Sequence, residues 1–382
     1  MKELLHLLTE ADRLRRAQQP FALATVVKIN GSTYRRPGAR MLIDPDGATC
    51  GTISGGCLEQ EVARQALAVI ETGRAQVLPF DLTDDDLILG FGTGCNGIVH
   101  VLIEPVPVPG RTDPTQLVEA CLAGRQSGVM AQIIDASDDA DLLGRRLLLL
   151  EDDTTRGDLD APSLRAALHQ EAAQTLAEGR HKIRPYATKG GPVEVLFEVV
   201  RPPVRLVLFG AGHDVAPVVR LAKTMGWPVT IVGRKPAAVL AERLPEADEH
   251  IFLMHPDQAL DYVRLDARSA AVVMNHQYTR DKALIGVLLH APVPYIGALG
   301  PRDRAGRIVD ELREEQPDLT DAHFARVHGP IGLDIGTETP EEIALSMIAE
   351  IQAIHHHRTG GMLRHRAGAI HEKVLLSDSI SQ

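Results

Sequence analysis

The sequence predicts an α/β protein in which an N-terminal mixed α/β domain is followed by a C-terminal Rossmann-like domain with a parallel sheet. Three observations indicate this. A chain of 382 residues is too long for one ordinary core. Its second half alternates apolar strands with helical runs, which is typical of a parallel sheet covered on both faces. Gly210-Ala211-Gly212 follows one such strand and opens a helix, as in a Rossmann phosphate loop.

Changes in composition suggest the domain limits. We expect the N-terminal domain over residues 1–200, the Rossmann-like domain over 201–358 and a tail over 359–382. Arg201-Pro202-Pro203 marks the main boundary, and a stiff proline-rich connector near 105–114 lies within the first domain.

The N-terminal domain reads as mixed strands with few helices. Met1–Pro20 has the pattern of an amphipathic helix, and Gly73 is expected to end a helix that starts near residue 58. Residues 114–200 alternate helix and strand again and are expected to complete the same sheet. The expected strands are Phe21–Ile29, Met41–Ile43, Gln76–Phe80, Gly97–Ile103 and Val193–Val200, with a further helix near 162–179.

The ends of helices and strands are marked more clearly in the sequence of the Rossmann-like domain. Its last helix should start at Thr339, with Pro340 in the first helical position and Glu342 completing a capping box. The expected strands are Val204–Phe209, Val229–Val232, Ala270–Met274 and Tyr295–Ile296.

Bulk composition narrows the class of protein. The formal net charge of −11 argues against a nucleic-acid partner or an anionic membrane. No apolar run is long enough to span a bilayer. The four cysteines form no CxxC pair, which fits a reducing compartment, and we therefore expect a cytoplasmic protein.

Cys57 lies where the glycine-dense stretch Gly51–Glu59 turns into a helix that Ser54 could cap. Helix N-termini favour thiolate over thiol, and Gly55 and Gly56 let a bulky ligand approach the backbone. This pattern suits a seat for an anionic or metal-bearing ligand. A small buried cysteine behind a tight turn is an equal alternative.

Two further loops could contribute to the same site. The loop Gly31–Ala39 contains Ser32, Arg35 and Arg36, and arginine suits planar or phosphate-bearing ligands, although a solvated turn is the alternative. Cys95 lies in a second glycine-rich loop and would pair with Cys57 if the loops meet, since thiolates suit soft metals. Alternatively, only one of the two cysteines matters. Cys50 and Cys121 read as structural.

The C-terminal domain departs from the dinucleotide-binding pattern. Val215 stands where a third glycine or alanine is usual, and no acidic residue follows the second strand, which ends in Gly233-Arg234-Lys235. A 2′-phosphate or another anionic ligand therefore suits this strand end better than NAD. His276 follows the strand Ala270–Met274 and is either a ligand contact or proton carrier, or a polar loop histidine.

These motifs together resemble the XdhC/CoxI family of xanthine dehydrogenase accessory proteins. The resemblance rests on three stretches and covers most of the chain outside about 110–190. The stretches are Gly31-Ser32 through Arg36-Pro37-Gly38-Ala39 to Gly51–Glu59; Gly94-Cys95-Asn96-Gly97 to Ile103-Glu104-Pro105; and Gly210–Asp214 through Met274-Asn275-His276, Tyr295-Ile296-Gly297 and Ile331–Gly336 to Thr339–Glu342. Gly233 departs from the family, in which an acidic residue is usual there.

The resemblance implies a chaperone and no catalytic residue. Members of the family hold the molybdenum cofactor while its metal gains a sulfido ligand, and then deliver it to an apo molybdenum hydroxylase such as xanthine dehydrogenase. A cysteine desulfurase partner and a homodimer are also expected. The expected cofactor-binding residues are Ser32, Arg35, Arg36, Gly55, Gly56, Cys57, Glu59, Cys95, Gly210, Gly212, His213 and His276. The position of Cys57 at a helix start suggests that its thiol lies nearest to molybdenum, with Cys95 assisting.

A second hypothesis is an NAD(P)-dependent oxidoreductase that uses the C-terminal domain. The Gly-x-Gly loop and His276 favour it, whereas Val215 and Gly233 weaken it.

Overall fold

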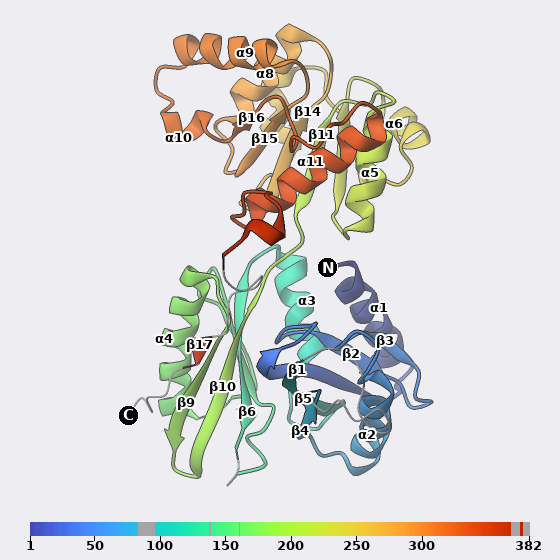
Figure 1. The fold of residues 1–382 in the computed structure, drawn as a ribbon, viewed down its shortest axis with the longest axis vertical. Coiled ribbons are helices and arrows are strands. Elements are labelled where there is room, and N and C mark those ends of the chain that lie inside the picture. Colours follow the sequence, from blue (N-terminus) through green and yellow to red (C-terminus); the bar gives the residue numbers. More distant parts are fainter. Residues whose placement is uncertain (83–95, 137–138, 160, 368–374, 377–382) are drawn as a thin grey trace. The chain divides into compact units, whose positions relative to one another are not determined.

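The structure is a computed structural model that describes residues 1–82, 96–136, 139–159, 161–367 and 375–376 (Figure 1). The chain divides into two compact units. Among the described residues, the N-terminal unit contains 3–202 and 375–376, and the C-terminal unit contains 203–367 together with 1–2. Each unit is described by itself.

The first sheet of the N-terminal unit has the strand order β3-β2-β1-β5-β4, and all its pairings are antiparallel. The long strand β1 buries alternate side chains on opposite faces, so Phe21 and Leu23 pack against helix α1 while Ala22 and Ala24 pack against helix α2. The elements are α1 (Lys2–Arg16), β1 (Phe21–Ser32), β2 (Arg40–Ile43), β3 (Thr49–Gly51), α2 (Glu59–Thr72), β4 (Gln76–Asp81) and β5 (Asn96–Val106).

Residues 114–200 form a second sheet, so the expectation that they complete the first one is wrong. Its strand order is β17-β9-β10-β6-β7-β8. Strands β1 and β5 already have partners on both sides, and the strands after them pair with one another instead. The elements are α3 (Pro114–Gly124), β6 (Gly128–Asp135), β7 (Arg146–Leu150), β8 (Thr155–Gly157), α4 (Pro162–Glu178), β9 (Lys182–Thr188), β10 (Gly191–Val200) and β17 (Leu375–Leu376).

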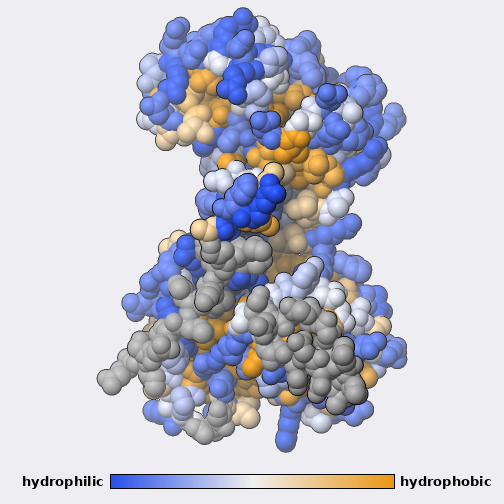
Figure 2. All heavy atoms as spheres, in the orientation of Figure 1, coloured by the Kyte–Doolittle hydropathy of each residue, from blue (hydrophilic) through white to orange (hydrophobic). Residues whose placement is uncertain are grey.

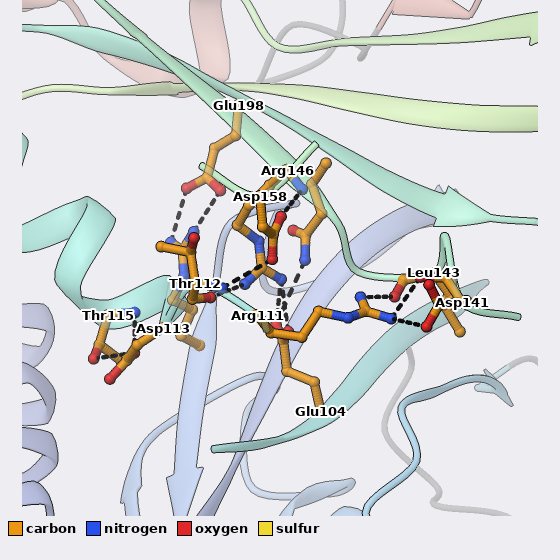
Figure 3. Close-up of polar contacts among 12 residues, drawn as sticks. Glu104, Arg111, Thr112, Asp113, Thr115, Asp141, Leu143, Arg146, Asp158 and Glu198 are labelled. Carbon is orange, nitrogen blue, oxygen red and sulfur yellow. Dashed lines mark hydrogen bonds and ion pairs between the residues drawn. The ribbon is translucent and has the colours of Figure 1, made fainter. Parts of the chain in front are cut away.

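Two buried ion pairs connect the two sheets (Figure 3). Arg146 of β7 donates from Nη2 to both carboxylate oxygens of Glu104 in β5, at 2.8 and 2.6 Å. Arg40 of β2 donates to both oxygens of Glu198 in β10, at 2.8 and 2.5 Å. Burial raises the pKa of Glu198, but the Arg40 guanidinium outweighs this and lowers it overall. The sheets are therefore held in one unit by charged as well as apolar contacts.

The C-terminal unit is a Rossmann fold, as predicted. Its six parallel strands have the order β13-β12-β11-β14-β15-β16, which is the 3-2-1-4-5-6 order of dinucleotide-binding domains. The strands are β11 (Arg205–Phe209), β12 (Val229–Gly233), β13 (Glu249–Phe252), β14 (Ser269–Val273), β15 (Tyr295–Ala298) and β16 (Val327–His328).

Helices cover both faces of this sheet, and each face has its own apolar core. Val215 is completely buried in one of these cores, so the residue that departs from the glycine pattern is a packing residue. The helices are α5 (Val215–Thr224), α6 (Ala237–Arg243), α7 (Ala259–Tyr262), α8 (Tyr278–Leu288), α9 (Arg302–Glu315), α10 (Asp321–Phe324) and α11 (Pro340–His355).

Helix α11 starts as its sequence predicts, because Thr339 and Glu342 form a reciprocal capping box and Pro340 follows the cap. Figure 2 shows hydrophobic residues over α11 and a second hydrophobic group near α10 and β16 on this face of the unit, and Leu345 of α11 is 52% exposed. Every helix in the described part of the chain is too short or too polar to cross a membrane.

Candidate functional site

The glycine-dense loop before α2 is organised by two side chains of its own. Ser54 Oγ accepts hydrogen bonds from the backbone N–H groups of Gly56, Cys57 and Leu58, at 3.1, 3.0 and 3.2 Å. The Glu59 carboxylate accepts from Ser54 Oγ at 2.5 Å and from the backbone N–H groups of Ile53, Ser54 and Leu58. The loop is thus a compact turn whose N–H groups point inward.

The prediction that Ser54 caps the helix is wrong in detail. The first helical residue is Glu59 and the capping position is Leu58, which makes no side-chain capping bond. Ser54 instead closes the preceding turn, because its hydroxyl accepts from N–H groups two to four residues ahead. Cys57 therefore lies two residues before the helix.

Glu59 is charged within this turn. Burial raises its pKa, but hydrogen bonds from the Ser54 hydroxyl and from backbone N–H groups outweigh burial and lower the pKa overall. The carboxylate is thus a structural anion that fixes the loop around Cys57. This structural role explains why the acidic residue Glu59 lies beside a site that is expected to bind an anion.

The structure leaves open space at Gly56, the residue before Cys57. The thiol is free and its residue is half-buried. A Cβ atom added to Gly56 would have no neighbour within 4 Å, and one added to Gly55 would lie 3.9 Å from the Tyr34 ring. The arginine loop that contains Tyr34 therefore adjoins the loop that contains Cys57.

A second link between the two loops runs through helix α1. The Glu3 carboxylate accepts from the backbone N–H of Thr52 at 2.5 Å, from Thr52 Oγ1 at 2.7 Å and from Arg35 Nη2 at 2.8 Å. Arg35 and the glycine-dense loop thus contact the same carboxylate. Neither Glu3 nor Thr52 was singled out from the sequence, because no local pattern marks a helix residue that contacts loops 32 and 49 positions away.

The far end of the arginine loop is anchored to the second sheet. Arg40 donates to the carbonyl of Gly38 as well as to Glu198, and a Cβ at Gly38 would lie 2.7 Å from a Glu198 carboxylate oxygen. Glycine at this turn, where φ is +94°, is therefore required. The charge of Arg36 lies close enough to His181 to help lower its pKa, although burial of that histidine is the main cause.

Two predicted site residues lie wholly or partly outside the described part of the chain. Cys95 lies outside the described residues, as does most of its glycine-rich loop. Ser32 ends β1 opposite Asn96, but its side chain is not among the described ones. Among the described residues, no group of three His, Cys, Asp or Glu side chains is placed to hold a metal ion.

The predicted residues of the C-terminal unit gather where β11 and β14 end. These neighbouring strands form the topological switch point of the sheet, because β12 and β13 lie on one side of them and β15 and β16 on the other. Rossmann folds bind their ligands at this point. Gly210 has a φ of +152°, and a Cβ there would lie 2.5 Å from the carbonyl oxygen of Met274. The first glycine of the motif is therefore required for a close backbone approach.

His276 pairs with a carboxylate at these strand ends. Its Nε2 lies 2.9 Å from Oδ2 of Asp214, the residue that precedes α5. Its φ of +59° is unusual for a residue with a side chain, and strain of this kind clusters at functional sites. Asp214 also lies against Gly212, whose added Cβ would be 2.3 Å from Asp214 Oδ1, while the neighbouring His213 is exposed.

The end of β12 explains the missing acidic residue. A Cβ at Gly233 would lie 3.0 Å from Leu240 Cδ2 of helix α6, so an acidic side chain there would crowd this leucine. The next residue, Arg234, is exposed. Arg280 donates to the carbonyls of Leu253 and Met254, and its pKa is lowered by burial and by the charge of Arg234. The strand end is therefore cationic.

Comparison with known proteins agrees with this architecture. The profile of the XdhC and CoxI family matches residues 14–81, and that of the XdhC Rossmann domain matches residues 206–351. A probable subunit of xanthine dehydrogenase from Bacillus subtilis is 33% identical over 90% of this chain and 96% of its own. The molybdenum cofactor insertion chaperone PaoD of Escherichia coli is 23% identical over 88% of this chain and 84% of its own.

A solved structure shows the same fold. It is described as a xanthine dehydrogenase from Bacillus halodurans, is 27% identical, and superposes with a TM-score of 0.71 over 94% of this chain and 97% of its own. The two profiles match the two units in which the candidate residues lie, and the Bacillus subtilis relative matches nearly the whole length. The chain belongs to the XdhC and CoxI family.

Proposed function

We propose that the protein is an accessory protein that binds the molybdenum cofactor, protects it while its metal gains a sulfido ligand, and delivers it to an apo molybdenum hydroxylase such as xanthine dehydrogenase. The names of two relatives, one a probable part of xanthine dehydrogenase and the other a cofactor insertion chaperone, support this. In this role the chain carries out no turnover of its own, and a cysteine desulfurase supplies the sulfur.

One observation carries the proposal to this chain: the arginine loop and the Cys57 loop adjoin. Tyr34 faces Gly55, and Arg35 shares the Glu3 carboxylate with Thr52. The residues fit the cofactor, because the Arg35 guanidinium suits a phosphorylated pterin and a molybdenum–sulfur centre tolerates a thiol neighbour such as Cys57.

Each residue then has a distinct part. Arg35 binds the phosphate, Gly55 and Gly56 allow the ligand to approach the backbone, and Glu59 holds the loop in shape. Cys57 is the thiol that faces the metal. The cofactor, when bound, would supply the redox chemistry.

Replacing Cys57 with alanine tests this assignment. We expect the variant, co-expressed with cofactor synthesis, to retain clearly less molybdenum than the wild-type protein after purification. Cys50→Ala is the matched control, because Cys50 is also a half-buried free thiol but contacts His6 from strand β3. Undiminished molybdenum in Cys57→Ala, or equal losses in both variants, would contradict the role of Cys57. Sedimentation of the same preparations tests the expected homodimer.

We also propose that the C-terminal unit binds a phosphate-bearing nucleotide. The strand order, the close approach at Gly210 and the cationic end of β12 support this. In folds of this kind, an arginine near the end of the second strand accommodates a 2′-phosphate. NADPH should therefore bind more tightly than NADH, and Arg234→Ala should remove the difference. Equal binding of the two nucleotides to the wild-type protein would refute this.

A further inference from the structure

The Glu3 carboxylate lies in a set of donors that is characteristic of an oxyanion site. One carboxylate oxygen accepts from both the N–H and the hydroxyl of Thr52, and the other accepts from the Arg35 guanidinium. A backbone N–H, a hydroxyl and a guanidinium are the groups with which proteins bind phosphates. These donors come from the two loops of the proposed cofactor site, whereas the carboxylate comes from elsewhere.

Helix α1 does not need this contact in order to stay in place. Its apolar face buries Leu7, Leu8, Ala11 and Leu14 in the core between the two sheets. Glu3 lies in the first turn, ahead of these anchors. The carboxylate can therefore leave Thr52 and Arg35 by side-chain rotation while the helix remains packed.

Solvent reaches this point. The side chains of Glu3 and Arg35 are 36% and 30% exposed. Burial raises the pKa of Glu3, but the hydrogen bonds from Thr52 and Arg35 outweigh burial and lower it overall. The group that occupies the donors at neutral pH is therefore an anion that an external anion can reach and replace.

We propose that Thr52 and Arg35 form a binding site for a phosphate monoester, and that Glu3 occupies this site as an internal competitor until the ligand displaces it. The exchange is non-covalent: the phosphate takes over the three hydrogen bonds, and the Glu3 carboxylate becomes hydrated. Identifying the monoester with the phosphate of the cofactor rests on the proposed function, whereas the oxyanion site itself does not.

Glu3→Gln tests the competition, because the amide keeps the shape of the side chain and removes its charge. Inorganic phosphate, titrated by calorimetry into the purified full-length protein at constant ionic strength, should bind the variant about tenfold more tightly than the wild-type protein, which corresponds to about 1.4 kcal/mol. Glu10→Gln is the matched control, since Glu10 lies on the same helix but pairs with Arg13. The control should bind phosphate like the wild-type protein.

The double variant Glu3→Gln/Arg35→Ala should lose the gain, and circular dichroism identifies any variant that fails to fold. Thr52→Ala in the Glu3→Gln background provides a second route to the same loss. The proposal is overturned if Glu3→Gln binds phosphate no better than the wild-type protein. It is also overturned if each of the two double variants still binds phosphate as tightly as Glu3→Gln.

Cofactor loading separates this inference from the proposed function. Glu3→Gln could bind phosphate tightly while the protein purified from a cofactor-producing strain contains no pterin. This pair of results would refute the cofactor role and support the oxyanion site. Normal pterin loading together with unchanged phosphate binding would refute the competition and leave the cofactor role standing.

Discussion

Removing the guanidinium of Arg146 should destabilise the N-terminal unit strongly (Figure 3). Arg146 is 1% exposed and donates to both oxygens of Glu104, whose next hydrogen-bond donor, Gln132 Nε2, lies 3.5 Å away. In Arg146→Met, the Glu104 carboxylate, which is only 8% exposed, loses its countercharge. Breaking a buried pair in this way costs about 3–5 kcal/mol.

The double variant Arg146→Met/Glu104→Met should recover most of this loss. It removes the unpaired charge along with its partner, and apolar replacement of a whole buried pair is often neutral or stabilising. Arg16→Met is the control, because the Arg16–Asp12 pair is 80% and 41% exposed and its loss should leave stability unchanged.

Hydrogen-exchange mass spectrometry of peptides from β5 and β7 provides the assay. The chain has one tryptophan, Trp227, which lies in the C-terminal unit, so its fluorescence does not report on this pair. A loss below about 1 kcal/mol in Arg146→Met, or a double variant as unstable as the single one, would refute the reasoning.

Three further outcomes are expected. Gly210→Ala should destabilise the C-terminal unit by about 1–3 kcal/mol, because the added Cβ meets the Met274 carbonyl at a positive φ; an unchanged Trp227 unfolding transition would contradict this. Glu59 has a lowered pKa, so its contribution to stability is present above the ordinary value of 4.5 and is lost as pH falls through its native pKa. The melting temperature of Glu59→Gln should therefore depend less on pH in that acidic window than the melting temperature of the wild-type protein. An equal pH dependence of the two melting temperatures would contradict this role of Glu59. Thr339→Ala removes the capping hydroxyl of α11 and should cost about 1 kcal/mol in denaturant unfolding, whereas no loss would show that the cap is dispensable.

Features set by a few neighbouring residues could be predicted from the sequence. Gly73 ends α2 in the left-handed conformation, and the Thr339–Glu342 box starts α11, because both depend on local backbone geometry. The Rossmann fold was also predictable, since the strand–Gly210–helix pattern and the alternation after it restrict the topology.

Features set by distant contacts could not be predicted. The second sheet of the N-terminal unit depends on which strand edges are free, which the pattern of residues 114–200 does not encode. The contact of Glu3 with Arg35 and Thr52 depends on where α1 packs. Ser54 fits a helix cap by residue type, yet its hydroxyl closes the preceding turn because Glu59 starts the helix.

Pterin and molybdenum analysis of the protein purified from a strain that makes the cofactor tests the central claim most directly. The account predicts that both copurify with the wild-type protein and that Arg35→Ala, which removes the phosphate donor, strongly reduces both. Wild-type protein free of pterin, or Arg35→Ala protein loaded as fully as the wild type, would contradict the account.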